Sequence, residues 1–208
     1  MAKIAIVQHA PEVLDREATL DKAVRLISEA AAQDAQLVVF PEAFVPGYPA
    51  WVWRLRPGGD WDLSERIHRR LLENAVDLSK DGLSKLRTAA AEAGVTVVMG
   101  INERNREASN ASLYNSLLYI DDTGEILGTH RKLIPTGGER TVWAQGDGST
   151  LEAYDTSIGK LGGLICWENY MPLARMALFS KRVELYLAPT ADARDTWQAT
   201  LRHIACEG

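Results

Sequence analysis

The sequence contains little cysteine and no long apolar run. Its two cysteines, Cys166 and Cys206, make no disulfide framework, and no CxxC pair or Cys/His cluster supplies the ligands of a zinc site. No segment approaches the about 18 consecutive apolar residues of a membrane-spanning helix. The start MAKIAIVQHA also lacks the apolar stretch of a signal peptide. We therefore expect a cytoplasmic protein with reduced thiols, no membrane partner and no metal.

The sequence also has no excess of basic residues. Its net charge is −5 and its pI is near 5.4, whereas a nucleic-acid-binding domain normally carries a basic patch. One basic group, Arg66 with His68, Arg69 and Arg70, lies on a helical pattern, which is typical of a solvated helix face. The glycines fit no phosphate-binding spacing followed by a helix. We therefore expect neither a nucleic-acid partner nor a nucleotide site.

What is present is an ordinary globular composition, with 46% hydrophobic and 25% charged residues. The length and the lack of a linker or repeat predict one domain over residues 1–208. Short apolar runs rich in β-branched residues alternate with segments of helical period. The runs predict strands at 3–8, 36–40, 95–101, 113–120, 125–132, 151–154, 161–166 and 185–188. The periodic segments predict helices at 17–32, 63–76, 83–93, 173–179 and 196–207. This order indicates a layered α/β fold.

Reactive side chains follow several of the predicted strands. Glu42 comes directly after VVFP, Lys132 ends ILGTHRK, Glu139 follows in PTGGER, and Cys166 ends GGLIC. Each has an ordinary interpretation, because a buried thiol, a surface amine and solvated carboxylates are common. Together they form a coherent set: an amine stabilises negative charge, and a carboxylate accepts a thiol proton and later activates water. We expect them to meet at one rim of the sheets.

Other residues near these strand ends are weaker candidates. The aromatic Tyr48, Trp53 and Trp167 lie in loops next to Glu42 and Cys166, and they either shape an apolar pocket or pack in the core or an interface. Thr190 and Ala191 follow another predicted strand and could line the same site. His9 and His130 are the histidines that a Cys–His pair would need, and we regard that pairing as the weaker interpretation.

Three motifs, FPEAFVPGYP, HRKLIPTGGER and GGLICWENYMP, together resemble the nitrilase family of carbon–nitrogen hydrolases. CWENYMPLAR is more similar to the true nitrilase branch than to the amidase branches. The resemblance implies a four-layer α-β-β-α sandwich, dimers or helical assemblies, and no metal or organic cofactor. It maps a Glu-Lys-Cys triad onto Glu42, Lys132 and Cys166, and a second, structural glutamate onto Glu139. Family members continue beyond the final predicted helix, so we expect a C-terminally incomplete fold.

The resemblance implies hydrolysis of a small-molecule nitrile to a carboxylic acid and ammonia. Cys166 would attack the nitrile carbon to give a thioimidate, and water activated by Glu42 would convert it to a thioester and then to the acid. Two alternatives remain open. One is an amidase or carbamoylase with the same thiol chemistry. The other is a catalytically inactive fragment that only binds or assembles.

Overall fold

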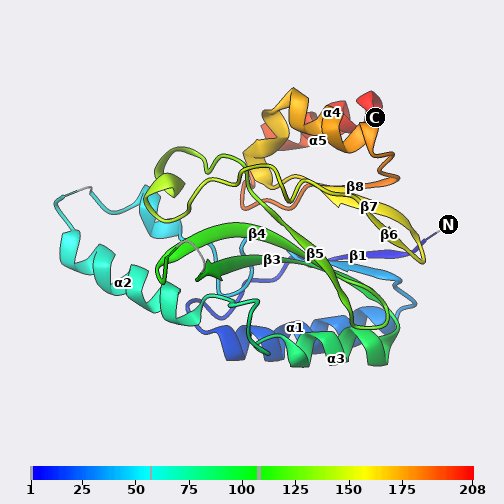
Figure 1. Ribbon diagram of the computed structural model, residues 1–208, viewed down its shortest axis with the longest axis horizontal. Helices are drawn as coiled ribbons and strands as arrows, with labels where there is room; N and C mark the ends of the chain where they lie inside the picture. Colours follow the sequence, from blue (N-terminus) through cyan, green and yellow to red (C-terminus); the bar gives the residue numbers. More distant parts are fainter. Residues whose placement is uncertain (1, 57, 107–108) are drawn as a thin grey trace.

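The computed structural model describes residues 2–56, 58–106 and 109–208, and its helices and strands form four layers (Figure 1). A five-stranded sheet and a three-stranded sheet lie face to face in the middle. The outer layers are α1 (Arg16–Ala31) with α3 (Ser84–Ala93) on one side, and α4 (Pro172–Ser180) with α5 (Asp195–Glu207) on the other. The predicted α-β-β-α sandwich is therefore confirmed.

The larger sheet has its strands in sequence order. They are β1 (Ile4–Ile6), β2 (Leu37–Val39), β3 (Thr96–Asn105), β4 (Ser112–Ile120) and β5 (Ile126–Arg131). The first three are parallel, and β4 and β5 are antiparallel to their neighbours. The turn between β4 and β5 is held by Asp121, whose Oδ1 accepts from the backbone N–H groups of Thr123 and Glu125, both at 2.9 Å. This turn joins the strands predicted at 113–120 and 125–132 as a hairpin.

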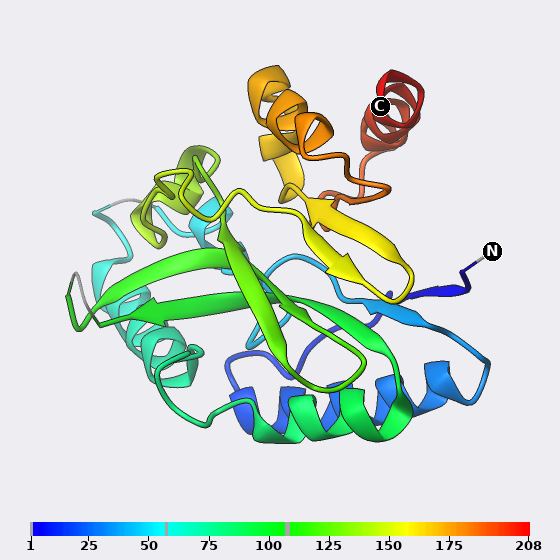
Figure 2. The ribbon, with the colours of Figure 1, turned by 45° about the vertical axis from the view of Figure 1, so that its right-hand side comes forward.

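The smaller sheet consists of β6 (Tyr154–Thr156), β7 (Gly159–Gly163) and β8 (Leu185–Leu187). It carries α4 and α5 on its outer face (Figure 2). The predicted strand at 151–154 is displaced, because Leu151 and Glu152 donate to the nearby carbonyls of Gly148 and Thr150 and so form a turn. The strand predicted at 161–166 ends early, at Gly163, because the chain turns into a 3₁₀ segment at Cys166.

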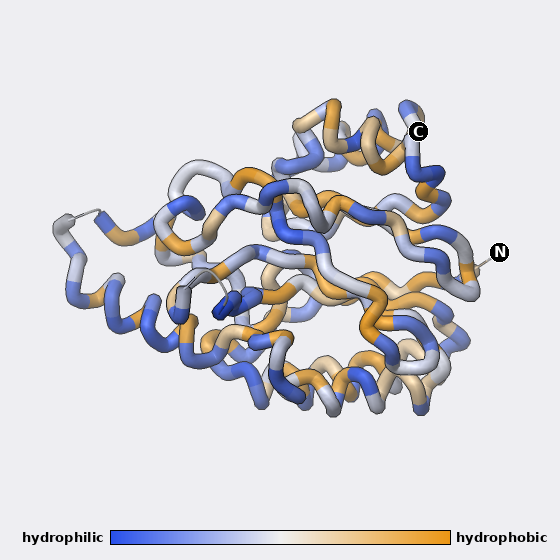
Figure 3. The backbone as a smooth tube through the Cα atoms, in the orientation of Figure 1, coloured by the Kyte–Doolittle hydropathy of each residue, from blue (hydrophilic) through white to orange (hydrophobic). Residues whose placement is uncertain are grey.

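Successive side chains of the long strands point to opposite faces of the larger sheet, where they belong to two different hydrophobic cores. In β3, Val97 and Met99 pack toward α1 and α3, whereas Val98 lies in the core between the two sheets. In β4, Leu117 and Tyr119 also face the smaller sheet. Full burial of such a side chain is worth about 1.5–3 kcal/mol. Figure 3 shows hydrophobic residues along these strands and hydrophilic residues on the outer turns of the helices.

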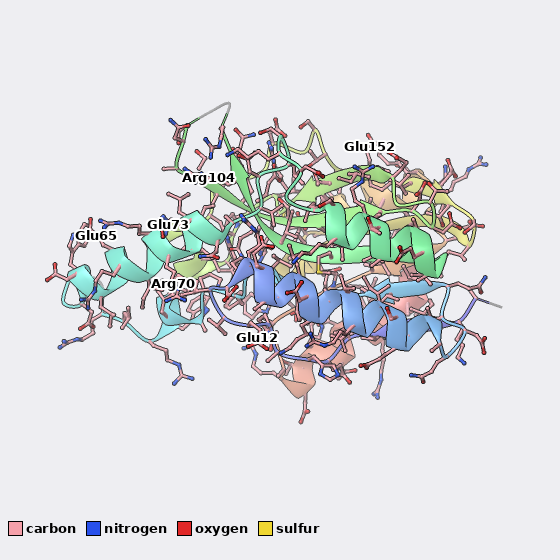
Figure 4. The ribbon with its side chains drawn as sticks, turned by 90° about the horizontal axis from the view of Figure 1, so that it is seen from below. Glu12, Glu65, Arg70, Glu73, Arg104 and Glu152 are labelled. Atoms are coloured by element: carbon pink, nitrogen blue, oxygen red, sulfur yellow. The ribbon has the colours of Figure 1, made fainter. Side chains whose placement is uncertain are left out.

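Viewed from below, α1 and α3 lie side by side, and α2 (Trp61–Asn74) extends beyond them (Figure 4). The basic residues Arg66, Arg69 and Arg70 of α2 are exposed and His68 is half-buried, as predicted for a solvated helix face. Among the described helices, none combines the length and apolar character that crossing a membrane requires.

Candidate active site

Glu42 is buried between the end of β2 and the smaller sheet, where three donors fix its carboxylate. Its Oε1 accepts from Lys132 Nζ at 2.8 Å and from Asn115 Nδ2 at 2.9 Å, and its Oε2 accepts from the backbone N–H of Ala191 at 2.8 Å. The backbone of residues 41–43 passes close to β3 at Gly100. Glycine is required there, since a Cβ would lie 2.2 Å from the carbonyl oxygen of Pro41. Glu42 is thereby held rigidly.

Lys132 directly follows β5 and lies between two carboxylates. Its Nζ is 2.8 Å from Glu42 Oε1 and 2.8 Å from Glu139 Oε2, and its side chain is fully buried. Burial alone would lower the pKa of Lys132, but the charges of Glu42 and Glu139 outweigh it and raise that pKa above its usual value. The amine is therefore held as a cation in a buried site, where it can stabilise developing negative charge.

Glu139 lies in a 3₁₀ segment, Gly137–Thr141, and holds Lys132 from the other side. Its Oε2 also accepts from the backbone N–H of Thr136 at 2.7 Å, and its Oε1 accepts from the Tyr48 hydroxyl at 2.6 Å. Burial and the adjacent Glu139 raise the pKa of Tyr48, so its hydroxyl remains a donor. Trp53 Nε1 donates in turn to Tyr48 at 3.0 Å. A chain of hydrogen bonds thus runs from Trp53 through Tyr48 and Glu139 to Lys132.

Cys166 begins the 3₁₀ segment Cys166–Tyr170 with a left-handed backbone, φ 52°. Its N–H donates to the carbonyl of Pro189 at 2.8 Å, and its Sγ accepts from Thr190 Oγ1 at 3.0 Å. Burial raises the pKa of the thiol to about 12; the charge of Glu42 acts in the same direction, and Lys132 opposes it. The resting thiol is therefore protonated at neutral pH. The thiol also interacts with the carboxylate of Glu42, which is placed to take its proton.

The predicted pocket residues occupy different places around this cluster. Thr190 contacts the thiol and Ala191 contacts Glu42, whereas Tyr48 reaches Lys132 only through Glu139. Trp53 and Trp167 are both exposed, at 52% and 40%.

Trp167 is fixed by two neighbouring side chains on the exposed side of Cys166. Its Nε1 donates to Asp192 Oδ2 at 2.9 Å, and the Arg194 guanidinium lies 5.0 Å over its ring. Hydrogen bonding to Arg194 and to Trp167 holds the pKa of Asp192 well below its usual range, although burial opposes this. The indole is therefore held by a charged pair at the rim of the site.

Three polar residues that support the cluster were not expected from the sequence. Asn115 holds Glu42, and it had a visible signal as a polar residue inside the apolar run LYNSLLYI. Glu168 and Asn169 hold the turn at Cys166, and both lie in the quoted motif CWEN. His130 contacts Glu168 through Nε2, at 3.0 and 3.1 Å, and His9 is exposed. The described contacts therefore favour a carboxylate over histidine as the partner of the thiol.

The chain is similar to known proteins over nearly its whole length. Residues 3–208 match the family model described as carbon-nitrogen hydrolase. The chain is 45% identical to the bifunctional nitrilase/nitrile hydratase NIT4B of Nicotiana tabacum, with 99% of this chain and 58% of that protein aligned. It is 44% identical to an aliphatic nitrilase of Sinorhizobium fredii, with 99% of this chain and 66% of that protein aligned. The chain thus spans about three fifths of the length of these curated relatives.

A solved structure shows the same fold. The NitN amidase of Nesterenkonia sp. AN1 superposes with a TM-score of 0.76 at 23% identity, covering 100% of this chain and 74% of the amidase. Within the described part of the chain, no group of three or more His, Cys, Asp or Glu side chains could hold a metal ion.

Proposed function

Because the chain belongs to the carbon–nitrogen hydrolase family, we propose that it is part of a nitrilase that hydrolyses an organic nitrile to the carboxylic acid and ammonia. Relatives at 44–46% identity bear nitrilase names, which supports nitrile as the substrate class. The observation that carries the proposal is the convergence of three buried groups. Lys132 Nζ lies 2.8 Å from Glu42 Oε1, and the adjacent residues Thr190 and Ala191 donate to the Cys166 sulfur and to the Glu42 carboxylate.

In the first half of the reaction, the sulfur of Cys166 adds to the nitrile carbon. The thiol proton passes to Glu42 and then to the nitrile nitrogen, which gives a thioimidate. Because the pKa of the thiol is raised to about 12, this proton transfer must accompany the attack. Lys132 and the backbone N–H of Trp167 stabilise the negative charge that develops on the substrate.

In the second half, Glu42 takes a proton from a water molecule that adds to the thioimidate carbon. The resulting tetrahedral species has one hydroxyl, one amino group and the sulfur on carbon. Breaking its C–N bond releases ammonia and leaves a thioester, which a second water hydrolyses to the acid and the free thiol. Breaking its C–S bond instead would release the amide. Glu139 serves to hold Lys132, with which it shares a hydrogen bond of 2.8 Å.

The substrate enters, in this proposal, from the exposed side of Cys166. Thr190 contacts the sulfur and Ala191 adjoins Glu42, so these residues border the reacting carbon. Trp167, and Trp53 with Tyr48, provide aromatic surface beside it. We regard the aromatic residues as substrate-binding because both tryptophans are exposed to solvent rather than packed in a core: 40% for Trp167 and 52% for Trp53.

The test is release of ammonia from a panel of aliphatic, aromatic and arylacetonitrile substrates, each paired with its amide. We expect ammonia and acid from one or more nitriles, at a higher kcat/KM than from the matching amide. A higher kcat/KM for the amides would favour the amidase or carbamoylase alternative. The ratio of amide to acid released measures how often the tetrahedral species breaks its C–S bond rather than its C–N bond. Relatives named as bifunctional nitrilase/nitrile hydratases raise this question. The second alternative, an inactive fragment, predicts no ammonia from either class.

We further propose that the protein acts in the cytoplasm as a homo-oligomer. Both cysteines are free, which suits a reducing compartment. Three apolar side chains beside or on α4 are exposed, Tyr170 at 48%, Leu173 at 85% and Met176 at 62%, and such a patch supports association of copies. Light scattering of the chain and of a Leu173→Glu variant tests this proposal. The variant should shift toward monomer, and an unchanged mass would exclude this surface.

A further inference from the structure

Glu168 lies two residues after Cys166 in the same 3₁₀ segment, and its carboxylate joins this segment to the one that carries the ammonium. Its Oε1 accepts from the backbone N–H of Leu133 at 2.7 Å, directly after Lys132. Its Oε2 accepts from the backbone N–H of Ile165 at 2.8 Å, directly before Cys166. One carboxylate thus bridges the end of β5 to the turn after β7.

The bridge is fully enclosed. The Glu168 side chain is 0% exposed and that of His130 is 1% exposed. Both carboxylate oxygens accept backbone N–H groups, so His130 Nε2, at 3.0 and 3.1 Å, must be the donor to them. Nδ1 of His130 is buried without a hydrogen-bond partner among the described residues. Glu168 is therefore the partner that orients the ring, and the ring in turn fixes the carboxylate.

The turn at Cys166 needs such support, because its backbone is in a region that non-glycine residues seldom adopt, with φ 52°. A residue in this region keeps its conformation only where its surroundings determine it. Glu168 holds the turn from the side of Ile165. Asn169 Nδ2 holds it from the other side by donating to the carbonyls of Leu164 and Cys166, both at 2.8 Å.

We propose that Glu168, held by His130, is a positioning residue that fixes the Cys166 thiol relative to the Lys132 ammonium. Only the expected effect on kcat rests on the proposed function; the expected effect on thiol alkylation does not. The paired hydrogen bonds to Leu133 and Ile165 set the separation of the two segments. A misplacement of about 1 Å between reacting groups can cost roughly 10²-fold in rate. The carboxylate touches no substrate in this account and acts only through the backbone.

The experiment replaces Glu168 with glutamine in a Cys206→Ala background. Glutamine keeps the shape but has one acceptor oxygen, so its amide NH₂ must face the N–H of Leu133 or of Ile165. Two rates are measured at one pH: kcat on the best nitrile, and alkylation of the thiol by iodoacetamide, quantified on the tryptic peptide Leu161–Arg175. We expect kcat to fall about 100-fold with KM within about threefold of the parent, and alkylation to slow about tenfold.

The matched control is Glu103→Gln, the same substitution at another buried carboxylate. Glu103 accepts from Ser116 Oγ at 2.7 Å and from Arg131 Nε at 3.1 Å, and both partners are side chains. Its loss should lower thermal stability and leave kcat and alkylation within about threefold. Equal losses in the two variants, after correction for the folded fraction, would reduce Glu168 to a general structural role and overturn the inference. So would parental rates in Glu168→Gln.

A second pair of variants covers the case in which Glu168→Gln does not fold. His130→Gln retains a donor toward Glu168, whereas His130→Phe retains the ring and removes the donor. We expect the glutamine variant to keep most of the alkylation rate and the phenylalanine variant to lose it; equal rates would overturn the inference. If the parent chain hydrolyses no nitrile, the proposed function fails, and the alkylation rates still decide the positioning role.

Discussion

Nζ of Lys132 lies 2.8 Å from Oε1 of Glu42, and neither side chain has any exposed surface. Removing a charged pair from water costs free energy, which is recovered only when the geometry is good and the remaining hydrogen-bonding groups are satisfied. Here Glu139 supplies a second carboxylate at 2.8 Å, while Asn115 and Ala191 complete the partners of Glu42. The cluster has the properties of a site built to keep an amine charged beside a reactive thiol.

Lys132→Ala is expected to damage both folding and activity. The substitution leaves the carboxylates of Glu42 and Glu139 buried without their shared cation, which should lower the free energy of unfolding by about 3–5 kcal/mol. Loss of a group that stabilises transition-state charge should lower kcat by a further ~10²–10³-fold in the folded fraction. Denaturant titration and nitrile kinetics on one preparation measure the two effects.

Lys80→Ala is the control for Lys132→Ala. Lys80 is 62% exposed and lies 3.9 Å from Asp77, so its loss should change neither quantity appreciably. If Lys132→Ala unfolded at the same denaturant concentration as Lys80→Ala, Lys132 would not be a buried cation that stabilises the fold.

The thiol of Cys166 should behave as a weak acid. Burial raises its pKa to about 12, so the thiolate fraction grows tenfold for each pH unit until that value is approached. In the Cys206→Ala protein, we expect the rate of alkylation by iodoacetamide to keep rising from pH 7 to pH 10. A plateau near pH ~8.5, the ordinary value for cysteine, would show that Lys132 outweighs burial and Glu42.

Tyr48→Phe should slow the reaction without removing it. The Tyr48 hydroxyl donates to Glu139 at 2.6 Å, and a hydrogen bond to a charged group is worth about 1.5–3 kcal/mol. Glu139 would hold Lys132 less firmly, and we expect kcat to fall by about tenfold or more. Trp53→Phe keeps an aromatic ring and removes only the indole N–H that donates to Tyr48 at 3.0 Å. Because that hydrogen bond is exposed to solvent, we expect kcat to fall less than in Tyr48→Phe. The reverse order of effects would show that the aromatic surface of Trp53 matters more to the reaction than the hydrogen bond from Tyr48 to Glu139.

Much of the layered fold was predictable, because it follows from local patterns. The alternation in β3 and β4, the hairpin at Asp121 and the helical period of α1 each depend on residues close together in the sequence. The meeting of Glu42, Lys132 and Cys166 was also expected, from their positions at strand ends.

The supporting contacts were not predictable, since they join residues far apart in the chain. Tyr48 and Glu139 are separated by 91 positions, and Glu42 and Ala191 by 149. The left-handed backbone of Cys166 has no local signal either, because cysteine does not favour φ of 52°. That conformation follows from the bonds that Glu168 and Asn169 make to the turn.

The most direct test of the nucleophile is the mass of tryptic peptides after the chain has reacted with a nitrile that it hydrolyses and has been quenched in acid. Trypsin places Cys166 in Leu161–Arg175 and Cys206 in His203–Gly208, so the peptides separate the two thiols. We expect a thioimidate or acyl adduct on Leu161–Arg175, no adduct in Cys166→Ala, and unchanged turnover in Cys206→Ala. An adduct on His203–Gly208, or hydrolysis that persists in Cys166→Ala, would contradict the role of Cys166 as the nucleophile.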